Sequence, residues 1–219
     1  MIRLAMILWL GLAAVAQAEA IVAQGLHSDR DFYRVISCGA VPGEACKKPH
    51  KRWSVASAAD LTIGLQQVHP GYPEPLRDMV VDAFEAAVAE INAAGAEITL
   101  RWVQNEKPAI RVYLVNTPHS GTMDNTGFSA FDGQRIANAR VVSNRKGALI
   151  TFAAIAMSAT LDPSDIRSIA LEETFQALGF IYDIDNPDYA PLSILYERDS
   201  LLNGLGPQDI AALRTKYAY

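Results

Sequence analysis

The residues best suited to chemistry lie close together between positions 172 and 183. They are three carboxylates, an amide and a phenol, contributed by Glu172, Glu173, Gln176, Tyr182 and Asp183. Side chains four positions apart share one face of a helix, so Glu172 and Gln176 can point at one spot. Neighbouring carboxylates also push their pKa values apart, which is how acid and base roles divide in hydrolytic sites. The set predicts a polar site that binds a ligand or transfers protons.

A helix that ends at Gly179 is expected to position this set. Asp162 is suited to cap the start of the helix, and Gly179 supplies the left-handed residue that commonly ends helices. An apolar stripe at three- and four-residue spacing consists of Ile166, Ile169, Ala170 and Ala177. Glu173 lies on this stripe, where a carboxylate is costly unless it is paired or hydrogen-bonded. We expect hydrogen bonds from Gln176 or Tyr182 to hold it.

The same stretch resembles the zinc helix of the metzincin peptidases, and of their matrixin-like members most closely. Their motif is H-E-x-x-H-x-x-G-x-x-H, often followed by Asp. Glu172, Gln176 and Tyr182 occupy the three histidine positions of this motif. Glu173 occupies the position of the general-base glutamate. The turn glycine and the trailing aspartate of the motif are matched by Gly179 and Asp183.

Further matches extend the resemblance over roughly residues 53–219. The segment 193–196 resembles the Met-turn of these peptidases, with Leu195 in place of methionine, and residues 205–217 resemble their closing helix. Together with the segment 32–34, the cysteine pair and Trp53, the pattern resembles a secreted proteobacterial family known as domain of unknown function 2927, which is grouped with zincin-like folds. The resemblance implies an α+β, zincin-like fold: a mixed sheet with an active-site-type helix and a C-terminal helix.

The residues at the ligand positions argue against a zinc site. A catalytic zinc ion needs three protein ligands, usually histidines, and an open position, whereas this chain offers a carboxylate, an amide and a phenol. Oxygen ligands suit calcium or magnesium better, but three such groups are few for these ions. The histidines, none in a two-histidine metal spacing, are His27, His50, His69 and His119. We therefore predict no metal and no cofactor.

Two functions are consistent with this site, and the sequence leaves open whether the protein is an enzyme. The first is a catalytically inactive pseudo-protease that binds a peptide or an envelope partner in its cleft, by strand addition to an edge strand. The alternative is a hydrolase that uses Glu173 with an unusual or absent metal, with Tyr182 donating to a developing oxyanion. In a third interpretation, the polar cluster is only structural.

Residues 1–18 are typical of a secretory signal peptide. Arg3 precedes an apolar run over 4–15, and residues 16–18, Ala-Gln-Ala, form a small-x-small cleavage site. The run is too short to span a membrane, although a retained N-terminal anchor remains an alternative. A periplasmic or secreted protein is therefore expected. The net charge of −5, without a long basic run, argues against nucleic acid or an anionic membrane as the partner.

Residues 19–52 are expected to form an N-terminal arm with a disulfide loop, followed by one domain over 53–219. Cys38 and Cys46 are the only cysteines. In an exported chain such a pair most simply forms one disulfide, with a metal or redox role as the alternative. The basic residues within 47–52 are interpreted as a solvated face or as a contact for an acidic partner.

Hydrophobic periodicity predicts the order of the elements. The expected strands cover residues 31–36, 53–55, 61–65, 98–103, 109–115 and 147–159. A core-facing helix is predicted over 74–94, and a long polar loop over 116–137, a length typical of binding loops. The helix described above and a final helix follow. This order is consistent with the zincin-like fold that the resemblance implies.

Overall fold

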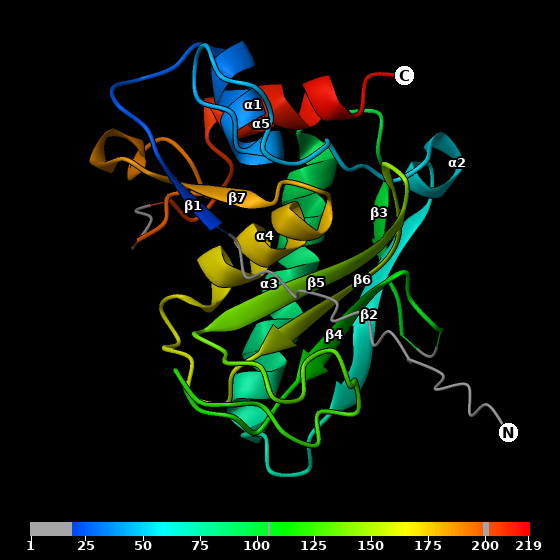
Figure 1. Ribbon diagram of the computed structural model, residues 1–219. Coiled ribbons are helices and arrows are strands. Elements are labelled where there is room, and N and C mark those ends of the chain that lie inside the picture. The colour runs from blue at the N-terminus through cyan, green and yellow to red at the C-terminus, as the bar shows by residue number, and fades with distance from the viewer. Residues whose placement is uncertain (1–18, 105, 199–201) are drawn as a thin grey trace, which may run out of the picture.

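The computed structural model describes residues 19–104, 106–198 and 202–219, and its centre is a five-stranded mixed sheet with the strand order β3-β2-β4-β6-β5 (Figure 1). The strands are β2 (Leu61–Val68), β3 (Leu100–Trp102), β4 (Ile110–Leu114), β5 (Ala139–Lys146) and β6 (Leu149–Met157). Only β5 runs antiparallel to its neighbour within this sheet. The predicted α+β class is confirmed, whereas the predicted signal peptide over 1–18 lies outside the described residues.

Helices cover one side of this sheet, and two further strands form a separate sheet. The further elements are α1 (Asp29–Cys38), α2 (Val55–Ala58), α3 (Glu74–Ala93), α4 (Ile166–Ala177), α5 (Pro207–Lys216), the 3-10 turn η1 (Pro187–Tyr189), β1 (Glu19–Val22) and β7 (Tyr182–Asp185). α3 packs along α4, and α1 packs on α5 (Figure 1). β1 pairs with β7 in parallel. Residues of the N-terminal segment, such as Phe32 and Ile36, belong to the same buried cluster as Ile63.

Most of the predicted elements form where periodicity placed them. The helix predicted over 74–94 is α3, and its apolar positions Val80, Phe84 and Ile91 are fully buried. The strands predicted over 98–103 and 109–115 are β3 and β4, and the apolar run 147–159 contains β6. These segments are long or strongly periodic, which is why the pattern identifies them.

The strand predicted over 31–36 is wrong, because these residues belong to helix α1. The Ser28 side chain accepts a hydrogen bond from the Asp31 backbone N–H, which caps the start of the helix. Gly39, with φ of 74°, ends it. Phe32, Val35 and Ile36 are fully buried, at the three- and four-residue spacing of a helix face.

Two other strand assignments also need correction. Residues 53–55 do not form a strand: Ser54 caps the short helix α2 by accepting a hydrogen bond from the Ser57 N–H. Conversely, β5 was not predicted, because its C-terminal half is exposed and polar and it pairs only with β6 among the described strands. Neither strand propensity nor hydrophobic periodicity identifies an edge strand whose residues are charged and polar.

The long loop over 116–137 covers the face of the sheet opposite to α3 and α4. Its Met123, Phe131 and Ile136 form a second buried cluster with Tyr113 of β4 and Ala154 of β6. The loop therefore contributes a small core of its own, which accounts for its length.

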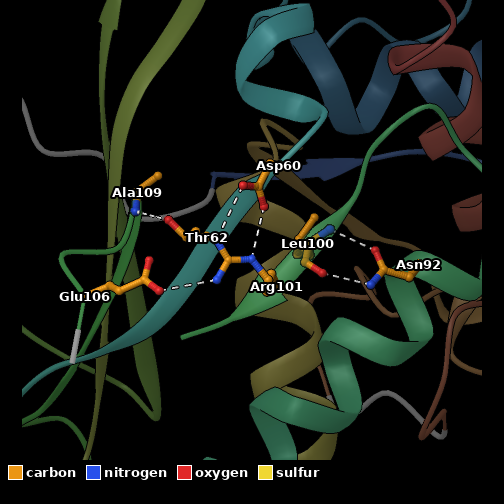
Figure 2. Close-up of polar contacts among 7 residues, drawn as sticks. All are labelled: Asp60, Thr62, Asn92, Leu100, Arg101, Glu106 and Ala109. Atoms are coloured by element: carbon orange, nitrogen blue, oxygen red, sulfur yellow. Dashed lines mark hydrogen bonds and ion pairs between the residues drawn. The ribbon is translucent and has the colours of Figure 1, made fainter. Parts of the chain in front are cut away.

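The β3 edge of the sheet is closed by a side chain. Figure 2 shows the Asn92 amide of α3 bonded to both backbone groups of Leu100. Its Nδ2 donates to the Leu100 carbonyl at 2.9 Å, and its Oδ1 accepts from the Leu100 N–H at 2.8 Å. Next to it, Arg101 bridges Asp60 and Glu106. An amide that imitates a neighbouring strand prevents this edge from pairing with another chain.

Replacing Asn92 by alanine is expected to lower the free energy of unfolding by about 2 kcal/mol, because it leaves two backbone groups of the buried Leu100 without a partner. Urea denaturation of the purified protein measures this difference. Asn92→Asp keeps the acceptor for the Leu100 N–H but places a second oxygen against the Leu100 carbonyl, so its loss should be at least as large as that of alanine. A loss below about 0.5 kcal/mol for the alanine variant would show that the amide does not close the edge.

Candidate functional site

Helix α4 carries three of the predicted site residues and begins later than the sequence suggests. The predicted cap at Asp162 is wrong: its Oδ1 accepts hydrogen bonds from the N–H and Oγ of Ser164, in a turn before the helix. The helix starts at Ile166, after Asp165, whose side chain makes no capping bond. Glu172, Glu173 and Gln176 therefore lie in its second half.

The C-terminal end of α4 is fixed by side chains from distant parts of the chain. Gly179 has φ of 96° and turns the backbone, as predicted. The carbonyls of residues 177, 178 and 179 accept hydrogen bonds from Trp53 Nε1, Tyr217 Oη and Lys216 Nζ, at 3.1, 2.8 and 2.8 Å. Helix ends leave such carbonyls without intrahelical partners. Burial lowers the pKa of Lys216 to about 7.

A pocket of about 520 Å³ lies between α4, the start of β5, β7 and the segment after residue 196. Its charged and amide side chains belong to Asn138, Arg140, Asp165, Glu172, Glu173, Gln176, Asp183, Glu197 and Arg198. The structure therefore brings together Glu172, Glu173, Gln176 and Asp183, as the sequence predicted. The pocket is rich in carboxyl groups and is bordered on one side by Ala139, Arg140 and Val141 of β5.

Gln176 links two of the carboxylates. Its Nε2 donates to Asp183 Oδ1 at 3.0 Å and to Glu172 Oε1 at 3.3 Å. The exposed fractions of Gln176 and Asp183 are 8% and 6%, so this bond is shielded from water. The amide NH₂ group thus occupies the space between the two carboxylates.

Glu173 is the most unusual residue of the pocket. Only 7% of it is exposed, and its Oε2 has no hydrogen-bond partner among the residues described. The hydrogen bonds predicted from Gln176 or Tyr182 to Glu173 are not formed within this part of the chain. Burial and the neighbouring Asp183 raise the pKa of Glu173 to about 8, while Arg140 of β5 acts in the opposite direction.

Three further carboxyls of the pocket, those of Asp183, Glu172 and Glu197, also have raised pKa values. Burial and the nearby Glu197 raise the pKa of Asp183 to about 7, against the hydrogen bond from Gln176. Burial, followed by Asp183 and Glu173, raises the pKa of Glu172 well above its ordinary value. Burial also raises the pKa of Glu197. Near neutral pH the pocket therefore holds protons on buried carboxyl groups.

Tyr182 lies outside this pocket. Along β7, successive side chains point to opposite faces, so Tyr182 faces away from Asp183. Its ring lies against Gly39, and Lys48 Nζ is 5.0 Å from the ring centroid. Tyr182, at the third histidine position of the zinc motif, therefore does not point toward Glu172 and Gln176, which occupy the other two.

A zinc ion does not fit the residues present. Gln176, at the second histidine position of the motif, donates N–H groups to Glu172 and Asp183. An N–H group has no lone pair with which to bind a metal ion. Within the described ranges, the one group of three His, Cys, Asp or Glu side chains whose ligand atoms all lie within 4.8 Å of one another is Cys38, Cys46 and His50. The two cysteines form the predicted disulfide, so they provide no thiolate ligands.

The segment that resembles a Met-turn is anchored by α5. Leu195 is fully buried, and its carbonyl accepts a hydrogen bond from the Ile184 N–H of β7 at 2.8 Å. The buried carboxylate of Asp209 accepts bonds from Ser193 Oγ and from the backbone N–H groups of Ile194 and Gly206. The segment leads directly to Glu197, whose N–H donates to the Ile184 carbonyl. The Leu195 side chain itself belongs to the main hydrophobic core and does not line the pocket.

Arg140, Glu197 and Arg198 line the pocket but were not predicted. Arg140 is 6% exposed and donates to the Arg135 carbonyl at 3.2 Å. Its segment was not recognised as a strand, and a single arginine in a polar stretch carries no sequence signal. His119 is exposed, and its Nδ1 lies 3.0 Å from Oδ1 of Asn138 at the pocket.

Comparison of the chain with models of known protein families gave no match, and comparison with curated proteins gave no significant match. The resemblance to zincin-like proteins therefore stays a prediction. None of the helices in the described parts of the chain is long and apolar enough to cross a membrane.

Proposed function

We propose that this protein is an exported pseudo-protease that binds an extended polypeptide without cleaving it. The peptide pairs with β5 and places one side chain in the pocket between β5 and α4. The observation that carries this proposal is the position of the pocket at an edge strand, since Ala139, Arg140 and Val141 of β5 line it. The disulfide between Cys38 and Cys46 is in keeping with export.

The two edges of the large sheet differ in a way that favours β5. β3 has three residues, and the Asn92 amide occupies the outward-facing backbone groups of Leu100 (Figure 2). β5 has eight residues and, among the described strands, pairs only with β6 (Figure 1). An edge strand directs alternate N–H and C=O groups outward, which is how extended peptides are recognised by strand addition.

Binding without hydrolysis is supported by the chemistry of the pocket. Gln176 and Tyr182 do not supply the ligands of a catalytic metal, for the reasons given above. Gln176 instead ties Glu172 to Asp183 and keeps both in place. A rigid polar pocket of this kind is suited to recognising a side chain.

One observation favours the alternative, a hydrolase that uses Glu173. The pKa values of Glu173 and Asp183, raised by burial to about 8 and about 7, lie in the range of efficient general acids and bases. In that case a peptide incubated with the protein is cleaved, and Glu173→Gln abolishes the cleavage while the fold is retained.

Hydrogen exchange tests where a peptide binds. Peptides selected from a random library on the purified protein should slow amide exchange in residues 139–146 and leave residues 100–102 unchanged. The β3 edge is the internal control, because Asn92 already closes it. Slower exchange at β3 or elsewhere, with β5 unaffected, would contradict the proposal.

A further inference from the structure

The pocket next to β5 has an excess of acidic groups. Five carboxyl-bearing residues and two arginines line it: Asp165, Glu172, Glu173, Asp183 and Glu197, with Arg140 and Arg198. One of these arginines, Arg198, already pairs with Asp185 outside the pocket, at 3.5 Å. When the carboxyls are ionised, the pocket is negative and complementary to a cation.

A second observation concerns a hydrogen-bond acceptor in the pocket. Glu173 is more than nine-tenths buried and lines the pocket, yet its Oε2 has no hydrogen-bond partner in the described parts of the chain. Buried side-chain oxygens nearly always have a partner. A donor that enters the pocket would supply it.

We propose that the pocket selects a lysine or arginine side chain of the bound polypeptide, with Glu173 as its principal acceptor. This inference rests on the proposed function, because the side chain is delivered by a peptide paired with β5. An ammonium or guanidinium group carries several N–H donors on a long stem, so it reaches a buried acceptor while its backbone stays at the sheet edge.

A divalent metal ion is a poorer match to the same pocket. Such an ion needs several oxygen ligands that converge on one point. Outside residues 1–18, 105 and 199–201, no three of the carboxylates in the pocket have ligand atoms all within 4.8 Å of one another. The Gln176 NH₂ group also lies between Glu172 and Asp183. Acceptors that lie apart from one another suit an ammonium or guanidinium group, which has several N–H donors, better than a metal ion.

The selectivity should depend on pH, because the cation competes with protons. Glu173 is faced by Glu172 on its own helix, Asp183 on β7 and Arg140 on β5, while Glu197 faces Asp183. Asp183 and Glu173 ionise as the pH rises through about 7 and about 8, respectively. A lysine side chain stays charged over this range, since its pKa is about 10.4. Affinity should therefore rise between roughly pH 6 and pH 9.

Positional peptide libraries test this proposal. Six-residue peptides carry lysine, arginine, norleucine or glutamate at one fixed position and mixed residues elsewhere, and fluorescence anisotropy measures their affinity. Lysine or arginine should bind about tenfold more tightly than norleucine, the size of one charge-assisted hydrogen bond. Glu173→Gln and Asp183→Asn should each reduce this preference, and Glu85→Gln on the exposed face of α3 should not.

The outcomes separate this inference from the function on which it rests. Libraries that bind with norleucine or glutamate as tightly as with lysine would leave peptide binding intact and overturn the charge selectivity. If no library binds, both are overturned. Calcium or zinc chloride that binds in a titration of the wild type, and not of Glu173→Gln, would identify the ligand as a metal ion and also overturn the proposal.

Discussion

Asp209→Ala is expected to destabilise the protein by about 4 kcal/mol. Asp209 is fully buried and accepts hydrogen bonds from Ser193 Oγ at 2.6 Å and from the Ile194 and Gly206 N–H groups at 2.9 Å each. Alanine removes the acceptor that these groups share, and each of the two buried backbone N–H groups left unpaired costs about 1–3 kcal/mol. Urea denaturation at neutral pH measures the loss.

Two variants control this measurement. Asp209→Asn keeps one acceptor oxygen in the same shape and should lose about half as much. Asp82→Ala removes an exposed carboxylate from α3 and should change the free energy of unfolding by less than about 0.5 kcal/mol. If the two alanine variants have the same free energy of unfolding, the hydrogen bonds of Asp209 to the segment before Glu197 do not stabilise the fold.

Glu173→Gln is expected to change how stability depends on pH. A carboxyl whose folded pKa is raised to about 8 contributes stability that is fully present below its ordinary pKa near 4.5 and is lost as the pH rises through 8. Glutamine does not ionise. The stability of the variant relative to the wild type should therefore rise by about 4 kcal/mol between pH 5 and pH 9, because each pKa unit between 5 and 8 corresponds to about 1.4 kcal/mol.

Thermal or urea unfolding at several pH values measures this gain. Glu85→Gln removes the same charge from an exposed position and should follow the wild type at every pH. A constant difference between Glu173→Gln and the wild type from pH 5 to pH 9 would mean that Glu173 ionises in the folded protein as it does in water.

The parts of the fold that the sequence predicts are those with a strong local pattern. α3 has buried residues at helical spacing, and β4 and β6 are nearly continuous apolar runs. The pattern fails where tertiary contacts decide. β1 and β7 form only because distant segments pair. The segment 31–36 is a different case, because it satisfies strand propensity while two local signals, the Ser28 cap and Gly39, favour a helix.

The same distinction applies to the candidate site. Helical spacing places Glu172 and Gln176 together, and the turn at Gly179 returns Asp183 to them, as expected. The alternation of β7 then decides that Asp183, and not Tyr182, enters the pocket, but this needs β7 to be recognised as a strand. Arg140 comes from an edge strand and the exposed Glu197 from the loop after β7, and the positions of both depend on contacts between segments distant in the sequence.

The central claim is that the pocket holds a peptide and leaves it intact. Mass spectrometry of a lysine-containing peptide library, incubated with the purified protein and then separated into bound and free fractions, tests this directly. We expect the bound fraction to contain peptides of unchanged mass, and Glu173→Gln to reduce the amount bound. New peptide termini that accumulate with time and disappear in Glu173→Gln would contradict the claim and establish a hydrolase.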